Sequence, residues 1–471
     1  MSVNIKKLIG TGSSALLLNV LSMGIKFGTN LVLAWLLIPE MFGIAAIITS
    51  IVTGMVLLSD VGINDSIIRN EKGEDRLFCG TAWLTQASRG FILYLVVLAI
   101  APLLASFYQL PELKTYLAIA GLALPIQGFK SVYLIVLQRR MNPLPEIKLE
   151  LVAQLTAAAC MLVLAINFQS IWVLISALII SAIVEMVGSH WITPRSFYLF
   201  KASKQYFLEI LHFGKWIYIG TVAAFLIINI DKLLLGKLES FSTLGIYQVA
   251  AAFSMISYSL SVSLLDRLIY PALASSAREN QDSMALAVKK LKRVIFPAIT
   301  AMQLIIFMIA PYFFAQLYPD TFQDAAWMAQ LMAVLVWIML AADFQGTVLV
   351  AINKPKIFGL VLLLVAILRP VFGLIAYPYF GIGGFLIGMM FGSLLGFFIY
   401  RHYLNQMLRH SEPYELVVAV VALSMIAILF SLSQSSETTA VLPVGLSLLF
   451  AAIITAAFVW SLRQAMAPAT E

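Results

Sequence analysis

Apolar segments long enough to cross a bilayer follow one another along almost the whole chain. We count fourteen of them, and about 20 apolar residues suffice for one helical span. They begin near Ile9, Met41, Phe78, Thr115, Ile147, Ser170, Lys215, Ser242, Val294, Ala325, Ile357, Gly381, Glu415 and Thr439. The segments are continuous and lack the period-2 alternation of a β-barrel, so they predict an all-α polytopic membrane protein. Only 11% of the residues are charged, against roughly 25% in soluble domains.

Lysine and arginine residues cluster at alternate ends of these segments. If the N-terminus is cytoplasmic, 23 of them lie on the cytoplasmic side, 2 on the opposite side and 5 within segments. This split follows the positive-inside rule. It predicts a multi-pass membrane protein with both termini in the cytoplasm. The net charge of +7 then reflects topology, and we expect no nucleic-acid partner.

The segments fall into two six-helix halves separated by a basic amphipathic stretch. We predict an N-lobe of helices 1–6 over residues 1–192, a cytoplasmic connector over 193–215, a C-lobe of helices 7–12 over 216–402, and helices 13 and 14 over 403–471. Phe42-Gly43-Ile44 and Leu244-Gly245-Ile246 open the second helix of each half. Such matching motifs indicate two repeats related by an axis along the membrane normal, with a site between them.

Several kinds of chemistry are absent from the sequence. No phosphate-binding loop with the G-x-x-x-x-G-K-[ST] pattern occurs. The predicted outer loops are too short to build a catalytic site, so we do not expect an enzyme. The four histidines and two cysteines show no ligand-like clustering, and we therefore expect no metal site and no cofactor.

Ionisable and amide side chains nevertheless lie inside the predicted spans. They are costly there unless they face protein or water, and they are functional-site candidates by default. In the N-terminal half these residues are Asn19, Lys26, Asn30, Asp60, Gln86, Arg89, Gln127, Lys130 and Glu185, and in the C-terminal half Asp231, Lys232, Asp343 and Arg369. Asn19, Lys26 and Asn30 follow a helical spacing, so they form one stripe that can face a cavity.

The basic members of this set favour an anionic ligand. Ammonium and guanidinium groups offset the desolvation of phosphates, so we expect the head of a diphosphate carrier to bind Lys26, Arg89, Lys130 and Arg369. The neutral residues that would line the cavity beside sugar hydroxyls are Asn19, Asn30, Gln86 and Gln127. Two alternatives stay open: Asp231 and Lys232 could form a purely structural ion pair, and Lys130 could extend to the membrane surface.

Three stretches of sequence resemble one known family. Pro39-Glu40-Met41-Phe42-Gly43 joins the first two predicted helices, and Asp60-Val61-Gly62 closes the second. NIDKLLLGKLESFSTLGIYQVA, from Asn229 to Ala250, and YPALASSARENQ, which follows the eighth helix, extend the pattern. The chain is similar to the Wzx-type flippases of the polysaccharide-transport branch of the multidrug/oligosaccharidyl-lipid/polysaccharide (MOP) exporter superfamily.

This resemblance implies a V-shaped, MATE-like pair of six-helix lobes that work by alternating access. The implied activity is flipping, across the bacterial inner membrane, of an undecaprenyl-diphosphate-linked oligosaccharide for exopolysaccharide, capsule or O-antigen of lipopolysaccharide. Membrane lipids are implied partners, a polysaccharide polymerase and a chain-length regulator are candidate partners, and we expect a monomer. The candidates for ion coupling or gating are Asp60, Glu185, Asp231, Lys232 and Asp343. The sequence does not distinguish a coupling proton from sodium.

Other functions stay open as alternatives. A drug or cation antiporter of the MATE type is the first, although the first helix carries Lys26 and no acid. A membrane glycosyltransferase or polymerase would need larger outer loops. A non-transporting scaffold of a polysaccharide-assembly complex would leave the charges inside the spans unexplained.

Overall fold

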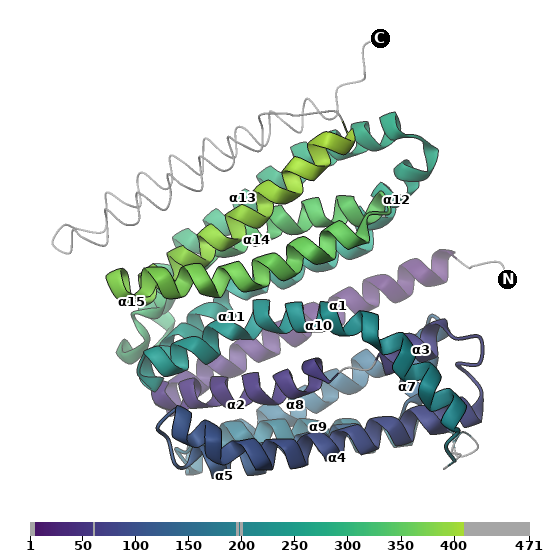
Figure 1. Cartoon of the computed structure of the whole chain (residues 1–471). Helices are drawn as coiled ribbons and strands as arrows, with labels where there is room; N and C mark the ends of the chain where they lie inside the picture. Colours follow the sequence, from purple (N-terminus) through teal and green to yellow (C-terminus); the bar gives the residue numbers. More distant parts are fainter. Residues whose placement is uncertain (1–4, 60–61, 195–196, 198–200, 409–471) are drawn as a thin grey trace. The chain divides into compact units, whose positions relative to one another are not determined.

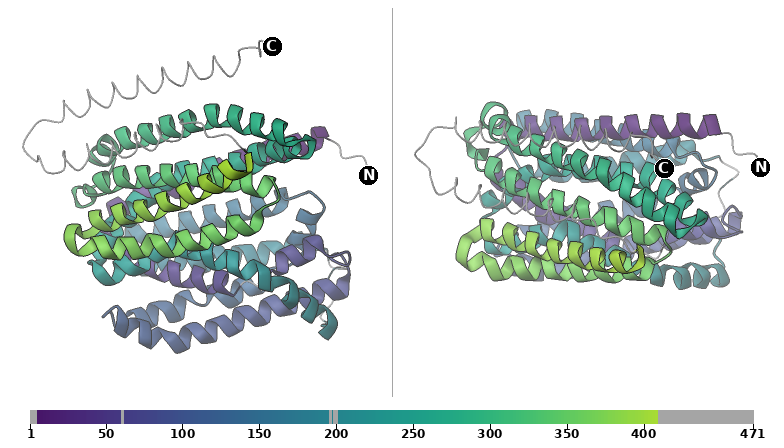
Figure 2. Two further views of the ribbon diagram at one scale, coloured as in Figure 1. Left: turned by 45° about the horizontal axis from the view of Figure 1, so that its top comes forward. Right: turned by 90° about the horizontal axis from the view of Figure 1, so that it is seen from above.

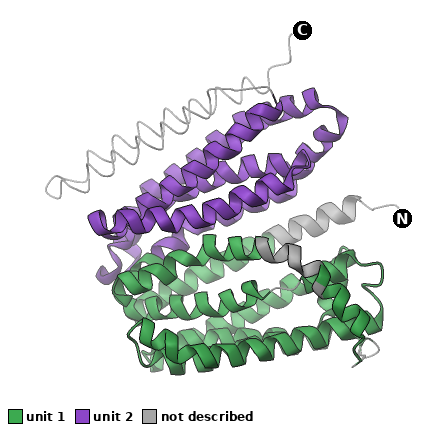
Figure 3. Cartoon of the chain, viewed as in Figure 1, with its two compact units in different colours: residues 1–248 green, residues 249–471 purple. Residues whose placement is uncertain are grey.

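The computed structural model describes residues 5–59, 62–194, 197 and 201–408 (Figure 1). Within these ranges all regular secondary structure is helical. The chain divides into two compact units, residues 1–248 and 249–471 (Figure 3). Long helices lie side by side within each unit, as the further views in Figure 2 also show. This division follows packing, and the lobe boundaries expected near residues 192 and 216 stay a prediction.

Unit 1 contains the helices up to the start of α11. They are α1 (Ile5–Leu36), α2 (Pro39–Leu58), α3 (Ile63–Arg69), α4 (Arg76–Phe107), α5 (Leu113–Ala120), α6 (Ala123–Gly128), α7 (Tyr133–Arg139), α8 (Leu144–Asn167), α9 (Trp172–Ile192) and α10 (Lys204–Leu238), followed by the beginning of α11 (Phe241–Leu264). In this unit α8 packs along α1 and α9, α4 packs along α5 and α6, and α10 packs along α2.

Unit 2 holds the rest of the described chain. Its elements after α11 are the π-helical turn η2 (Leu265–Ile269), α12 (Tyr270–Glu279), α13 (Gln281–Leu317), the 3₁₀ turn η3 (Asp320–Phe322), α14 (Ala325–Ala351) and α15 (Pro355–Leu408). Helix α14 packs between α13 and α15. Phe296, Phe344 and Leu349, all nearly or fully buried, lie in the hydrophobic core that these helices share with α12.

Nine helices in the described part of the chain are long and apolar enough to cross a membrane. A tenth span results if the bent pair Leu113–Gly128 and Tyr133–Arg139 counts as one. The first twelve predicted segments all coincide with helical structure: the fourth is divided among α5, α6 and α7, and the eleventh and twelfth are the two parts of α15. The predicted total of fourteen is not confirmed, because the segments that begin near Glu415 and Thr439 lie outside the described residues. The chain is a multi-pass membrane protein.

Two long helices, α15 and α10, each contain more than one of the predicted segments. Helix α15 is interrupted at Phe380 and Gly381, where the backbone leaves the helical region. Gly381 has φ of 57°, which a residue without Cβ adopts at no steric cost. This break confirms the predicted boundary between the eleventh and twelfth segments. Helix α10, in contrast, joins the predicted connector from Lys204 onward to the predicted seventh span.

The fourth predicted span is broken, although the sequence suggested a continuous helix. The two parts are bent by 57°, and Lys130 lies in the interval between them. Pro125 lacks the N–H that would bond the carbonyl oxygen of Gly121, so it accounts for the interruption between α5 and α6 and not for this interval. Gly128 lets α6 approach α4 closely, since a Cβ at this position would lie 3.0 Å from the carbonyl oxygen of Gln86.

Candidate functional site

Side chains from neighbouring helices satisfy the backbone at the break in the fourth span. Gln86 Nε2 donates to the carbonyl oxygens of Gly128 at 3.1 Å and Lys130 at 3.0 Å. His190 Nε2 lies 2.9 Å from the carbonyl oxygen of Phe129. Non-helical backbone is tolerated at membrane depth only where protein or water satisfies it. Gln86, expected to line a cavity, therefore also supports the break that holds Lys130.

Lys130 lies among carboxylates. Its Nζ is 3.3 Å from Glu185 Oε2 on α9 and 3.4 Å from Glu146 Oε1 on α8. Gln138 donates a hydrogen bond to the other oxygen of Glu146, and Ser181 Oγ donates to Glu185 Oε1 at 3.4 Å. The structure thus pairs Lys130 with Glu185, two of the residues selected from the sequence. The positive charge of Lys130 is offset by two negative charges.

Helix α1 brings Lys26 close to this group. Ser22 and Gln154 join α1 to α8 through two hydrogen bonds, one of them from Gln154 Nε2 to the carbonyl oxygen of Ser22 at 2.6 Å. Lys26, one turn further along α1, is exposed and acts electrostatically on Glu150 of α8. Asn19 and Asn30, the other members of the predicted stripe, are half-buried on the same helix.

Arg89 projects from α4 toward the end of α2. Its Nη1 donates to the carbonyl oxygen of Ser59 at 3.3 Å, and Ser59 caps the C-terminus of α2. A cation at this end of a helix is favoured by the helix dipole. Asp60, the next residue and a candidate for coupling, lies outside the described residues. Gln127, also expected to line the cavity, is exposed.

Asp231 and Lys232 form an ion pair in the last third of α10. Asp231 is only 5% exposed, and the hydroxyl of Tyr247 on α11 donates to its Oδ2. Lys232 Nζ lies 3.9 Å from Asp231 Oδ1 and donates to the carbonyl oxygen of Ile228 at 2.5 Å. These contacts tie α10 to α11. Such contacts are those of the structural ion pair that the sequence left open as an alternative.

Unit 2 contains a second buried polar group. Tyr258 of α11 hydrogen-bonds the side chain of Asp343 on α14, and the charge of Arg369 on α15 acts on both. Arg369 is 2% exposed. Asp266 in η2 also acts on Asp343, and π-helical turns occur frequently at functional sites. The structure therefore brings together Asp343 and Arg369, which the sequence analysis selected separately.

Comparison with known proteins places the chain in a family. A family model described as a polysaccharide biosynthesis protein matches residues 32–327, more than half of the chain. The chain belongs to this family. The match includes Arg89, Lys130 and Asp231, whereas Asp343 and Arg369 lie beyond it.

The chain is also similar in sequence to a curated transport protein. The succinoglycan biosynthesis transport protein ExoT of Rhizobium meliloti (strain 1021) is 24% identical over 263 residues, which are 55% of this chain and 52% of that protein. This polysaccharide biosynthesis protein therefore matches about half the length of its relative.

Solved structures with the same fold are transporters. A structure of the lipid II flippase MurJ in an inward closed conformation superposes with a TM-score of 0.69 at 12% identity, covering 94% of this chain and 97% of that chain. An inward-facing multidrug resistance MATE family transporter of the MOP superfamily gives 0.64 at 15% identity, covering 82% and 96%. At such identities the likeness concerns the fold alone. It confirms the predicted MATE-like fold class of this family member.

The sequence analysis missed several members of these polar groups. Glu146 and Glu150 carried a usable signal, because they lie four residues apart on the helix that follows Pro143 and so share one face. Tyr258 carried none, since a tyrosine in an apolar helix is ordinary. Asp266 was overlooked because it lies near the predicted end of the eighth span.

Proposed function

We propose that this polysaccharide biosynthesis protein flips oligosaccharide repeat units, linked to undecaprenyl diphosphate, from the cytoplasmic to the outer leaflet of the inner membrane. The product would serve a surface polysaccharide such as an exopolysaccharide, capsule or O-antigen. The two predicted six-helix lobes would give alternating access to the two leaflets. The protein would be a transporter without enzymatic activity of its own.

The family match over residues 32–327 is the observation that carries this proposal. Two named relatives support its parts: ExoT is a transport protein of succinoglycan biosynthesis, and MurJ, which shares the fold, is a flippase of lipid II. A lipid-linked sugar as cargo agrees with both names. The polymerase and the chain-length regulator stay candidate partners, and a monomeric state stays an expectation.

The diphosphate head would bind the basic side chains inside the helical units. Lys26 is exposed on a span and carries polar neighbours along α1, which supports a place in the pathway. Arg89 and Arg369 can each offer two parallel N–H donors to one phosphate group. Lys130 would contribute only after separating from Glu146 or Glu185, because these carboxylates offset its charge.

Coupling to an ion gradient would involve Asp343 in preference to the other candidate acids. Glu185 pairs with Lys130, and Asp231 pairs with Tyr247 and Lys232. Asp343 Oδ2 and Asp231 Oδ1 are both buried without a hydrogen-bond partner among the described residues, but Asp231 Oδ1 lies 3.9 Å from the ammonium group of Lys232. An oxygen in this state can accept a proton or coordinate sodium without breaking a contact.

A deletion in the native host tests the flippase proposal. We expect surface polysaccharide to disappear and lipid-linked oligosaccharide to accumulate on the cytoplasmic face, measured by extraction after leaflet-selective labelling. Complementation with the wild-type gene must restore both. Accumulation of the same lipid on the outer face would contradict the proposal, because translocation would then have occurred.

The second candidate function is a drug or cation antiporter. The fold shared with a multidrug MATE transporter and the three carboxylates around Lys130 favour it. In the same deletion strain this function predicts unchanged surface polysaccharide, no trapped lipid and new sensitivity to cationic dyes. The two functions therefore give opposite results in one experiment.

A further inference from the structure

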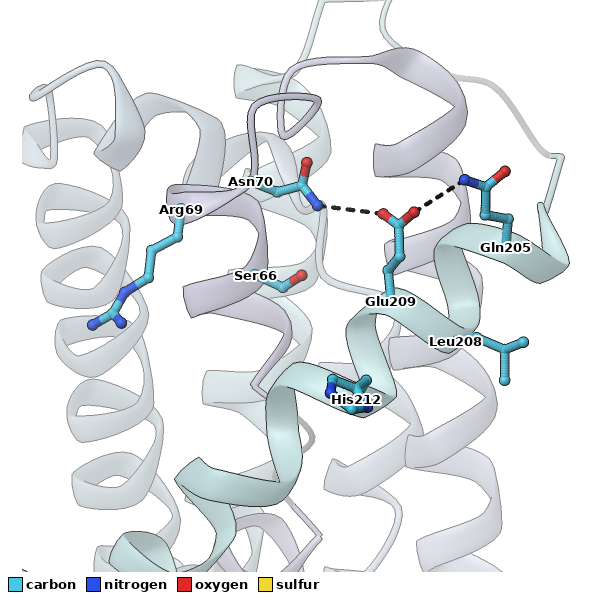
Figure 4. Close-up of a pocket in the computed structure, with 7 residues that line it drawn as sticks. All are labelled: Ser66, Arg69, Asn70, Gln205, Leu208, Glu209 and His212. Atoms are coloured by element: carbon cyan, nitrogen blue, oxygen red, sulfur yellow. Dashed lines mark hydrogen bonds between the residues drawn. The ribbon is translucent and has the colours of Figure 1, made fainter. Parts of the chain in front are cut away.

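A groove of about 650 Å³ lies on unit 1 between the end of α3 and the first turns of α10 (Figure 4). Ser66 and Arg69 line it from α3, Asn70 lines it as the residue that caps α3, and Gln205, Glu209 and His212 line it from α10. Ligand pockets for small molecules usually measure roughly 300–1,000 Å³. The groove is therefore large enough for a sugar with a diphosphate, and the proposed function has so far used none of these residues.

The walls of the α3–α10 groove are fixed by the core beneath them. Ile67 of α3 and Ile210 of α10 are fully buried in one hydrophobic cluster. Gln205, Glu209 and His212 follow a spacing of four and three residues, so they share the helix face next to this buried one. Arg139 donates to the carbonyl oxygens of Ile67 and Ile68 at the end of α3, at 2.8 and 3.0 Å. The lining is held in place before any ligand arrives.

One end of the groove has the chemistry of a sugar site. The carboxylate of Glu209 accepts two hydrogen bonds, as Figure 4 shows. Asn70 Nδ2 donates to one oxygen at 3.5 Å, and Gln205 Nε2 donates to the other at 3.2 Å. Each amide keeps a second N–H, and each carboxylate oxygen keeps acceptor capacity. Neighbouring sugar hydroxyls both donate and accept hydrogen bonds. This alternating arrangement of donors and acceptors therefore fits a hydroxylated ring.

The other end of the groove carries basic side chains. His212 lies about 10 Å further along α10 than Gln205, at 1.5 Å per residue, in the direction of the span. Arg69 lines the groove from α3, and its guanidinium suits a phosphate, but its side chain is directed away from Glu209 and α10 (Figure 4) and would have to turn toward the groove to meet one. Leu208, 53% exposed, adds an apolar contact. In a lipid-linked sugar the phosphates lie nearest the membrane and the sugars project outward, in the same order.

We infer that the α3–α10 groove is a docking subsite for the sugar-diphosphate end of the lipid-linked substrate. Asn70, Gln205 and Glu209 would hold the sugar nearest the carrier, with Arg69 and His212 beside the diphosphate. The lysine and arginine distribution predicts this side to be cytoplasmic, where such a substrate would be selected before translocation. This inference rests on the proposed function, and it adds a recognition step outside the membrane spans.

The test compares two probes on the purified full chain by native mass spectrometry. One probe is undecaprenyl diphosphate without sugar, and the other is the lipid-linked oligosaccharide extracted from the deletion strain. We expect the wild-type chain to prefer the glycosylated probe. Glu209→Ala should weaken binding of that probe about tenfold, as expected for loss of hydrogen bonds to a charged group, and leave the bare carrier unaffected.

Matched variants separate the possible outcomes. Glu71→Ala removes an exposed acid in the neighbouring loop and should change neither probe, while thermal unfolding checks that every variant folds. Unchanged binding of the glycosylated probe to Glu209→Ala would overturn the subsite alone. If phosphatidylethanolamine is added as a third probe and Glu209→Ala loses binding of this lipid alone, the groove binds a lipid headgroup. That result would also overturn the subsite. A wild-type chain that binds neither probe would overturn the proposed function with it.

Discussion

Gly43 and Gly245 lie at a reciprocal close approach of α2 and α11 within unit 1. A Cβ at Gly43 would lie 1.9 Å from the carbonyl oxygen of Phe241, and a Cβ at Gly245 would lie 1.8 Å from that of Pro39. These are the glycines of the two matching motifs in the sequence. The repeat seen in the sequence thus corresponds to a symmetric contact.

Gly43→Ala and Gly245→Ala should each destabilise the protein by about 1–3 kcal/mol, because the new methyl group meets backbone that must shift. The measurement is thermal unfolding of the purified protein in detergent. Gly24→Ala is the matched control, since nothing lies within 4 Å of a Cβ there. Equal melting temperatures for all three variants would contradict the close approach.

Lys130→Met should destabilise the protein by about 1–3 kcal/mol, because Glu146 and Glu185 would then be partly buried without their cation. Glu185→Gln should cost less, since Glu146 still pairs with Lys130. Thermal unfolding of the singles and of the double variant gives the coupling. A stable Lys130→Met protein without transport would instead assign Lys130 to substrate binding.

Arg89→Ala should abolish surface polysaccharide in a complemented deletion strain and leave the amount of inserted protein unchanged. Loss of a charge-assisted hydrogen bond to phosphate corresponds to about a tenfold or greater loss of binding. Arg76→Ala, which removes an exposed arginine at the start of the same helix, is the control. Normal polysaccharide with Arg89→Ala would remove Arg89 from the binding site.

Asp343→Asn should make transport independent of the ion gradient, because the amide cannot take up a proton and binds sodium weakly. The check is flipping in vesicles with and without an imposed proton or sodium gradient. Asp324→Asn changes an exposed acid just before the same helix and should behave as wild type. Unaltered gradient dependence in Asp343→Asn would place the coupling group elsewhere.

A surface ion pair should make stability depend on acid pH. Arg140 Nη2 lies 2.7 Å from Glu74 Oε2, and this hydrogen bond lowers the pKa of Glu74 below its usual 4.5. A carboxyl with a lowered pKa stabilises the folded state above the unfolded pKa, and this stabilisation is lost as pH falls through the folded pKa. Glu74→Gln should therefore melt slightly lower than wild type at pH 7 and equally at strongly acid pH. A difference that grows on acidification would contradict the pairing.

The helices were predictable because each apolar segment in a bilayer must satisfy its backbone hydrogen bonds within the segment itself. The boundary at Gly381 followed from the same pattern. The break at Lys130 was not predictable, since residues 129–132 contain neither proline nor glycine and Pro125 removes a backbone hydrogen bond only toward Gly121. Here Gln86 and His190, from two other helices, decide the outcome.

The ion-pair and hydrogen-bond partners of the charged residues could not be predicted from the sequence either. Lys26 and Lys130 looked alike as basic groups inside spans, yet one is exposed and the other pairs with two acids. A pattern along one helix gives the face of a residue, whereas its partner depends on which helix packs opposite. The pairing of Asp343 with Tyr258 depended on the same packing.

The support that Gln86 gives to the broken span has a consequence for motion. A continuous helix within a bilayer can bend only by losing backbone hydrogen bonds, and each unsatisfied group costs several kcal/mol there. At residues 127–130 the carbonyl oxygens already depend on a side-chain amide that reaches three of them, at 3.4, 3.1 and 3.0 Å. The two N–H groups of this amide can be shared in different ways among the three carbonyl oxygens. We therefore expect the bend to change its angle at a lower cost than a continuous helix would, and Lys130 would move with it.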